Sequence, residues 1–143
     1  MAELNNHKDY NKLFAENKER LKELSCINRT SKIIKENKSI EETLQKIVLS
    51  LPQAWQYPEN TVARIKYEDQ EYITPGFEET RWFQKQSFTS LDGEDGSIEV
   101  HYTKSFPDEY DGPFLKEEHE LLNNLANLIL GFINSYKAKE IIK

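Results

Sequence analysis

The sequence predicts an α+β fold in which an antiparallel β-sheet is packed on helices from the N- and C-terminal ends of the chain. Three observations lead to this prediction. Apolar residues recur at helical spacing in residues 10–36 and again after Gly112. Between these stretches, short segments alternate apolar and polar residues, as half-buried strands do. Turn signals separate these segments closely enough for hairpins, so neighbouring strands are expected to run antiparallel.

The first helix is expected over residues 10–36, with an apolar stripe that is thin for its length. Asn17, Asn28 and Ser31 interrupt the stripe, and the N-terminal half of the helix is too charged to be buried alone. Residues 1–20 are therefore expected to form a helical extension, such as a coiled-coil linker, and residues 21–143 to form the domain. The stripe consists of Tyr10, Phe14, Leu21, Leu24, Ile27 and Ile34.

A second, shorter helix is expected to follow directly. Ser39 is suited to cap it, and Glu42, three residues later, completes a capping box. Pro52 cannot continue a helix, so the helix is expected to end there. It has one apolar face, which is expected to be buried and consists of Ile40, Leu44, Ile47, Val48 and Leu51.

Four strands are expected next, over residues 61–68, 71–74, 81–90 and 97–104. Glu68-Asp69-Gln70 is expected to turn the chain between the first two strands, and the glycine-containing residues 92–96 predict a hairpin between the last two. One face of the strands is expected to pack against the terminal helices. It consists of Ala63, Ile65, Tyr67, Ile98, Val100 and Tyr102.

The last helix is expected to start after Gly112-Pro113, where Glu118 favours the positive end of the helix dipole. Its apolar residues form two seams, which face two different neighbours. One neighbour is the sheet, and the other is expected to be a helix, either from this chain or from a second subunit. We expect a parallel homodimer held by the terminal helices, with Ile129 and Ile133 as candidates for its interface. The seams are Leu121, Leu125, Leu128 and Phe132, and Leu122, Ala126, Ile129, Ile133 and Tyr136.

Composition excludes several classes of function. The net charge of −6 argues against nucleic-acid binding, which needs a basic surface. No apolar run approaches the length of a membrane span, and the first residues lack a signal-peptide pattern. The single cysteine, Cys26, cannot form an internal disulfide. We therefore expect a cytoplasmic domain with no nucleic-acid or membrane partner.

No residue pattern points to catalysis, a cofactor or a metal. Cys26 has no histidine nearby in the sequence and is expected to be a buried structural thiol. His7, His101 and His119 are too far apart in the sequence for metal-ligand spacing, and the five glycines form no phosphate-binding loop. His119-Glu120 has the order of a kinase phosphoacceptor, but the proline that usually follows is absent. A solvated surface histidine is the simpler interpretation.

The sheet face that points away from the helices offers the sharpest site hypothesis. Arg64, Glu99 and His101 alternate onto this face, and Trp82 joins them if its strand keeps register. An arginine and a carboxylate on neighbouring strands are most often a cross-strand ion pair on a solvated face. The alternative is a small pocket roofed by Trp55, Phe77 or Trp82, in which Arg64 would bind an acidic ligand.

Several short blocks in this order resemble the GAF-domain family, in particular the short GAF-like modules of prokaryotic signalling proteins such as sensor histidine kinases. The blocks are residues 51–58, residues 63–65, residues 96–102, and residues 112–115 followed by Glu118. The resemblance implies a GAF/PAS-like fold, terminal helices that dimerise and attachment to a histidine kinase or another signalling output. Residues 75–80 are too short for the helical lid of ligand-binding relatives. The cyclic-nucleotide signature and a bilin-attaching cysteine are also missing.

We therefore expect a noncatalytic sensory or regulatory module, which dimerises and relays a signal through its terminal helices, as in a two-component system. Its ligand, if it has one, would be an unidentified small molecule. The alternatives are a pure dimerisation or linker domain that binds no small ligand, and the phosphoacceptor domain of a histidine kinase.

Overall fold

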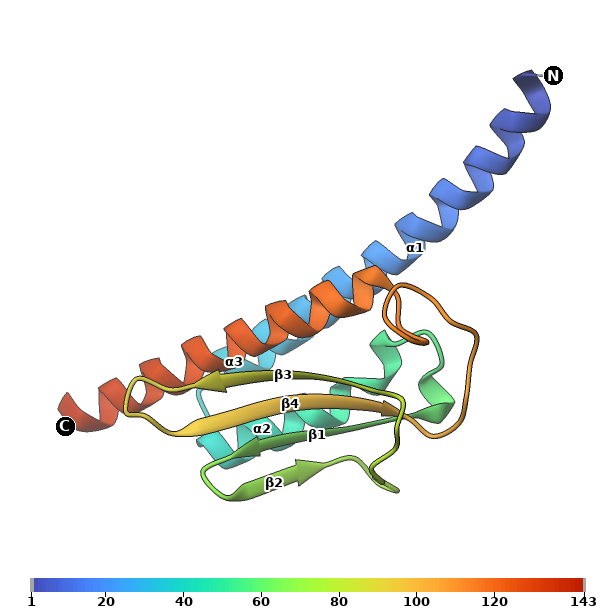
Figure 1. Ribbon diagram of the computed structural model, residues 1–143. Helices are drawn as coiled ribbons and strands as arrows, with labels where there is room; N and C mark the ends of the chain where they lie inside the picture. The colour runs from blue at the N-terminus through green and yellow to red at the C-terminus, as the bar shows by residue number, and fades with distance from the viewer. Residues whose placement is uncertain (1, 143) are drawn as a thin grey trace.

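The computed structural model describes the backbone of residues 2–142 and the side chains of residues 10–140 (Figure 1). It confirms the α+β class, with helices at both ends and a four-stranded antiparallel sheet between them. The first helix continues without a break across residue 20, where the extension was expected to end. In chain order, the elements are α1 (Ala2–Lys35), α2 (Ile40–Ser50), η1 (Pro52–Ala54), η2 (Pro58–Asn60), β1 (Thr61–Tyr67), β2 (Gln70–Ile73), β3 (Phe83–Thr89), β4 (Asp95–Tyr102) and α3 (Lys116–Ile142).

The strands are arranged in the order β2-β1-β4-β3, so the first and last strands pair at the centre of the sheet. A two-residue turn joins β1 to β2, and both of its residues, Glu68 and Asp69, have positive φ angles of 51° and 65°. This is the backbone of a type I′ turn, whose twist matches that of the strands. The residues expected to face the helices are all buried, which confirms the predicted alternation in β1 and β4.

The helices lie on one side of the sheet (Figure 1). α2 packs on β1 and β2, α3 packs on β3 and β4, and α1 lies against both of these helices. Local signals set the start of α2 as predicted, since the Ser39 hydroxyl accepts the Glu42 N–H at 3.1 Å. The core between these layers includes Trp55, Tyr102 and Phe114, which are almost fully buried.

The expectation that Ile129 and Ile133 form a dimer interface is wrong. Ile129 and Ile133 are fully buried within one subunit, as is Leu125 on the other seam. The physical reason is the position of α1, which runs beside α3 and forms the ion pair between Arg20 and Glu120. The sheet and α1 together enclose α3, so neither isoleucine can serve as an intersubunit contact.

Glu118, in the first turn of α3, holds three parts of the fold together. Its carboxylate accepts the N–H of Leu115 at 2.8 Å, the N–H of Gln56 at 2.7 Å and the hydroxyl of Tyr102 at 3.3 Å. The Leu115 bond satisfies a backbone donor at the helix start. The other two bonds connect α3 to the segment after η1 and to the end of β4. Burial raises the pKa of Glu118 to about 7.

Glu118 should make the protein less stable as the pH rises from about 4.5 to about 7. Its pKa is higher in the folded chain than in the unfolded chain, so the folded chain holds an extra proton in this window. Replacing Glu118 with Gln removes this titration. The stability of the parent should therefore fall relative to Glu118→Gln by up to about 3 kcal/mol across the window.

Urea unfolding at a series of pH values measures this difference. Glu117→Gln, at the neighbouring position of the same helical turn, is the matched control and should follow the parent. Parallel stability curves for the parent and Glu118→Gln would contradict the assignment.

Candidate functional site

Arg64, Glu99 and His101 meet on the sheet face that points away from the helices, as predicted. Register brings them together, because Arg64 on β1 lies directly across from Glu99 on β4, and His101 follows two residues later. The Nε and Nη2 atoms of Arg64 donate to the two carboxylate oxygens of Glu99, both at 2.9 Å. This two-point contact is the strongest geometry that a guanidinium can form with a carboxylate.

Two further carboxylates complete the surroundings of the guanidinium. Arg64 Nη1 donates to Glu71 on β2 at 3.0 Å, and Nη2 donates to Glu79 in the β2–β3 loop at 2.7 Å. The contacts with Glu99 and, after it, Glu79 raise the pKa of Arg64 above its usual value. Burial disfavours the charged form of Glu99, but its hydrogen bonds to Arg64 and His101 outweigh this, and its pKa is lowered. Arg64 and Glu99 are therefore both ionised at neutral pH.

This part of the face was expected to be solvated, and it is buried instead. Arg64, Glu99 and His101 are 8%, 3% and 2% exposed. The β2–β3 loop folds over them, and the guanidinium lies 4.8 Å from the centre of the Phe77 ring. The ring of Phe83, on β3, stacks on His101 with 5.2 Å between centroids.

The hydrogen bonds of His101 define its tautomer. Nδ1 accepts the backbone N–H of Thr80 at 3.1 Å, so the proton of a neutral ring lies on Nε2. That Nε2–H donates to Glu99 at 3.1 Å. His101 thus ties the loop to the ion cluster, and both ring nitrogens have partners.

Trp82 and Trp55 do not roof a pocket here, which corrects the prediction. Trp82 lies across from Tyr102, on the face that packs against the helices. Trp55 is fully buried in that same core, where its Nε1–H donates to Gln84 at 3.1 Å. Phe83, one residue after Trp82, occupies the predicted place beside His101. A shift of one residue along a strand moves every side chain to the other face.

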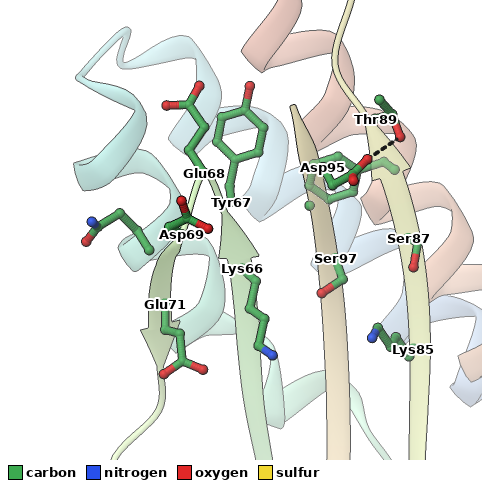
Figure 2. A pocket seen from close by; sticks show the side chains of 13 residues that line it. Lys66, Tyr67, Glu68, Asp69, Glu71, Lys85, Ser87, Thr89, Asp95 and Ser97 are labelled. Atoms are coloured by element: carbon green, nitrogen blue, oxygen red, sulfur yellow. Dashed lines mark hydrogen bonds between the residues drawn. The ribbon is translucent and has the colours of Figure 1, made fainter. Parts of the chain in front are cut away.

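The rest of this sheet face is open and forms a hollow of about 650 Å³ (Figure 2). Lys66 on β1 lies across from Ser97 on β4, which in turn lies across from Ser87 on β3. Lys85 flanks the same hollow from β3. Among the described residues, neither lysine has a carboxylate within ion-pair distance. Two unpaired ammonium groups near hydroxyls can bind a small anion.

Four acidic side chains line this hollow, of which Asp69 is exposed to solvent and the other three have partners. Glu71 pairs with Arg64, Glu68 pairs with Lys137, and Asp95 accepts the hydroxyl of Thr89 at 2.9 Å. The hollow was not predicted, although the alternation of Lys66 and Ser97 onto the outer face was visible in the sequence. The outer sheet face thus has an open half, which forms the hollow, and a closed half, which the β2–β3 loop covers.

The other candidate groups are not assembled for chemistry. Cys26 is fully buried, as predicted, and burial raises the pKa of its thiol to about 11. His119 is exposed at the start of α3, with its nearest ring neighbour, Tyr110, at 6.0 Å. Within residues 10–140, no three side chains of the metal-binding types converge. The side chain of His7 lies outside the described residues.

Comparison with known proteins leaves the family open: no family model, no curated protein and no solved structure matches the chain. The resemblance to GAF domains therefore stays a prediction. None of the helices in the described part of the chain combines the length and the apolar character that crossing a membrane requires.

The Arg64 cluster should behave as a structural ion pair. Arg64→Met leaves Glu99 buried without its counterion and should cost about 3–5 kcal/mol of stability. Adding Glu99→Gln removes the stranded charge and keeps an acceptor for His101, so the double variant should recover most of the loss. Urea unfolding measures both variants.

Glu79→Gln provides the control, because Glu79 is an exposed partner of the same guanidinium and its loss should change the stability far less than Arg64→Met does. A double variant as unstable as Arg64→Met would contradict the structural role of the ion pair.

Proposed function

We propose that the chain is a noncatalytic regulatory and dimerisation module of a cytoplasmic, GAF-like signalling protein, and that it acts as a homodimer through its terminal helices. The observation that carries the proposal is an exposed apolar stripe on α1. The stripe is exposed because the N-terminal half of α1 extends beyond the rest of the domain (Figure 1). A helix that projects alone into water has little to stabilise it.

The stripe lies on the side of α1 that faces away from its own domain. Tyr10, Phe14, Leu21 and Leu24 are 67%, 65%, 64% and 56% exposed. Cys26, on the opposite side of the helix, is fully buried against the core. One surface of α1 therefore completes the subunit, and the other is left without a partner inside it.

The spacing of the stripe favours a second helix as that partner. With Asn17 included, its residues alternate between steps of four and three, which is the heptad pattern of helix pairs. Burying each large apolar side chain contributes about 1.5–3 kcal/mol. A few such residues from each subunit are enough for a dimer of micromolar affinity or tighter. Association of terminal helices also gives a route by which a change in packing could reach a neighbouring domain.

The Arg64 cluster favours the alternative in which the predicted pocket binds nothing. Its donors are already satisfied by Glu71, Glu79 and Glu99, and Phe77 covers it. The open hollow beside it favours a second candidate function, which is binding of a small anion through Lys66 and Lys85.

Substitutions in the stripe should separate the subunits without unfolding them. Leu21→Glu/Leu24→Glu places two charges on an exposed surface, so each subunit should keep its fold by circular dichroism. Sedimentation should show a monomer for this variant and a dimer for the parent. Leu91→Glu is the matched control, because Leu91 is 89% exposed on the β3–β4 hairpin and should leave the dimer intact. If the parent sediments as a monomer at high micromolar concentration, the proposed homodimer is wrong.

Anion binding has a separate test. Inorganic phosphate and a dicarboxylate, each titrated into the parent, should raise the melting temperature with concentration. The same titration of Lys66→Gln/Lys85→Gln should give no such rise. An equal response of both proteins would show that the effect does not come from this hollow, and no response of the parent would favour a module without a small ligand.

A further inference from the structure

We infer that the two subunits pair in antiparallel fashion, so that the projecting half of α1 from one subunit lies in a groove between α1 and α3 of the other, with Phe14 against Gly131. This inference rests on the proposed homodimer and adds its geometry. In this geometry a second copy of the chain covers both the exposed stripe and the groove.

The groove lies at the opposite end of α1 from the projecting half. It has a volume of about 380 Å³, and its large apolar lining residues are Ile34 on α1 and Leu128, Phe132 and Tyr136 on α3. α1 and α3 run side by side in the same direction, with Arg20 next to Glu120 near the start of the contact (Figure 1). The groove therefore follows the helices toward their C-terminal ends.

Gly131 is an unusual residue for its position in the middle of α3. A glycine inside a helix is destabilising relative to alanine, because it loses more backbone freedom on folding. Nothing within the subunit requires it, since a Cβ atom at this position would meet no atom within 4 Å. Gly131 lines the groove, so a small residue there leaves room for a side chain that arrives from outside the subunit.

Two-fold symmetry connects the stripe to this groove. In an antiparallel pair with its axis between Leu21 and Leu24, these two leucines face each other across the interface. Phe14 precedes Leu21 by seven residues, and Ser31 follows Leu24 by seven. At 1.5 Å per residue, both lie about 10 Å from the leucines. The partner's Phe14 therefore reaches Ser31, which lines the groove together with Gly131.

The neighbouring residues fit the same register. Tyr10 precedes Leu21 by as many residues as Lys35 follows Leu24, and Lys35 also lines the groove. Leu13, which is 55% exposed, comes opposite the segment that contains Ile34. The apolar side chains of the projecting half thus meet the apolar lining of the groove, and each subunit supplies one of each, as a closed two-fold interface requires.

A parallel pair leaves these features unused. It places Phe14 against Phe14 and brings Lys35 close to Lys35, which is a like-charge contact. The groove would then face the Ser31 and Lys35 segments of the partner, and its apolar lining would gain little apolar cover. The antiparallel pair is favoured because it buries the stripe and the groove in one interface.

Cysteine cross-linking distinguishes the two geometries in the full chain. Phe14→Cys and Ser31→Cys subunits, one of them carrying a size tag, are mixed and oxidised mildly. The mixed disulfide dimer should be the main product, because only an antiparallel pair brings position 14 of one subunit to position 31 of the other. The parent chain is the control and should not cross-link, because its Cys26 is fully buried.

The other outcomes are equally informative. Dominant Phe14→Cys homodimers would overturn the antiparallel geometry and leave the proposed homodimer standing. No cross-link, together with a parent that sediments as a monomer, would overturn the inference and the proposed dimerisation together.

Gly131→Leu gives an independent test that does not depend on oxidation. The new side chain enters open space within the subunit, so the variant should melt no lower than the parent when both are compared as monomers in the Leu21→Glu/Leu24→Glu background. In the otherwise unchanged chain it should weaken the dimer at least about tenfold by sedimentation. A Gly131→Leu dimer as tight as that of the parent would overturn the placement of Phe14.

Discussion

The enclosure of α3 between the sheet and α1 is the packing constraint on which the rest of the structure depends. Most residues of the two apolar seams of α3 are buried within the chain, including Leu125, Ile129 and Ile133, whereas Leu128 and Tyr136 are half-buried. Polar contacts fix the helix at its two ends. Glu118 ties its start to the ends of β4 and the segment after η1, and Lys137 reaches Glu68 and Asp92 at the tips of the two hairpins. The core is therefore complete without a second chain.

This completeness determines which surface is left for association. Because α1 uses one side to cover α2 and α3, the stripe on its other side has no partner inside the subunit. The outer sheet face is divided in a similar way. The β2–β3 loop closes one half over the Arg64 cluster, and the half around Lys66 and Ser97 stays open. The closed half stabilises the sheet, and the proposed functions use the open half and the α1 stripe.

Features set by local chemistry could be predicted from the sequence, and features set by distant packing could not. Ser39 and Pro52 defined α2, and alternation in β1 placed Ile65 inward and Arg64 outward, since these signals act over a few residues. Trp82 was assigned to the wrong face because the β3 register depends on the pairing of Thr89 with Asp95, several residues away. The burial of the Arg64 cluster depends on where Phe77 folds, and the enclosure of α3 depends on the path of α1. No local pattern encodes either of these.

The central claim is that each subunit folds around α3 by itself, while the N-terminal half of α1 is stabilised by association. Amide hydrogen exchange over a dilution series tests this claim most directly. We expect the amides around Ile129 and Ile133 to stay protected at every concentration, whereas protection between Tyr10 and Leu24 should fall as the protein is diluted. Protection of the α3 amides that falls together with that of α1, or rapid exchange in the first half of α1 at every concentration, would contradict the claim.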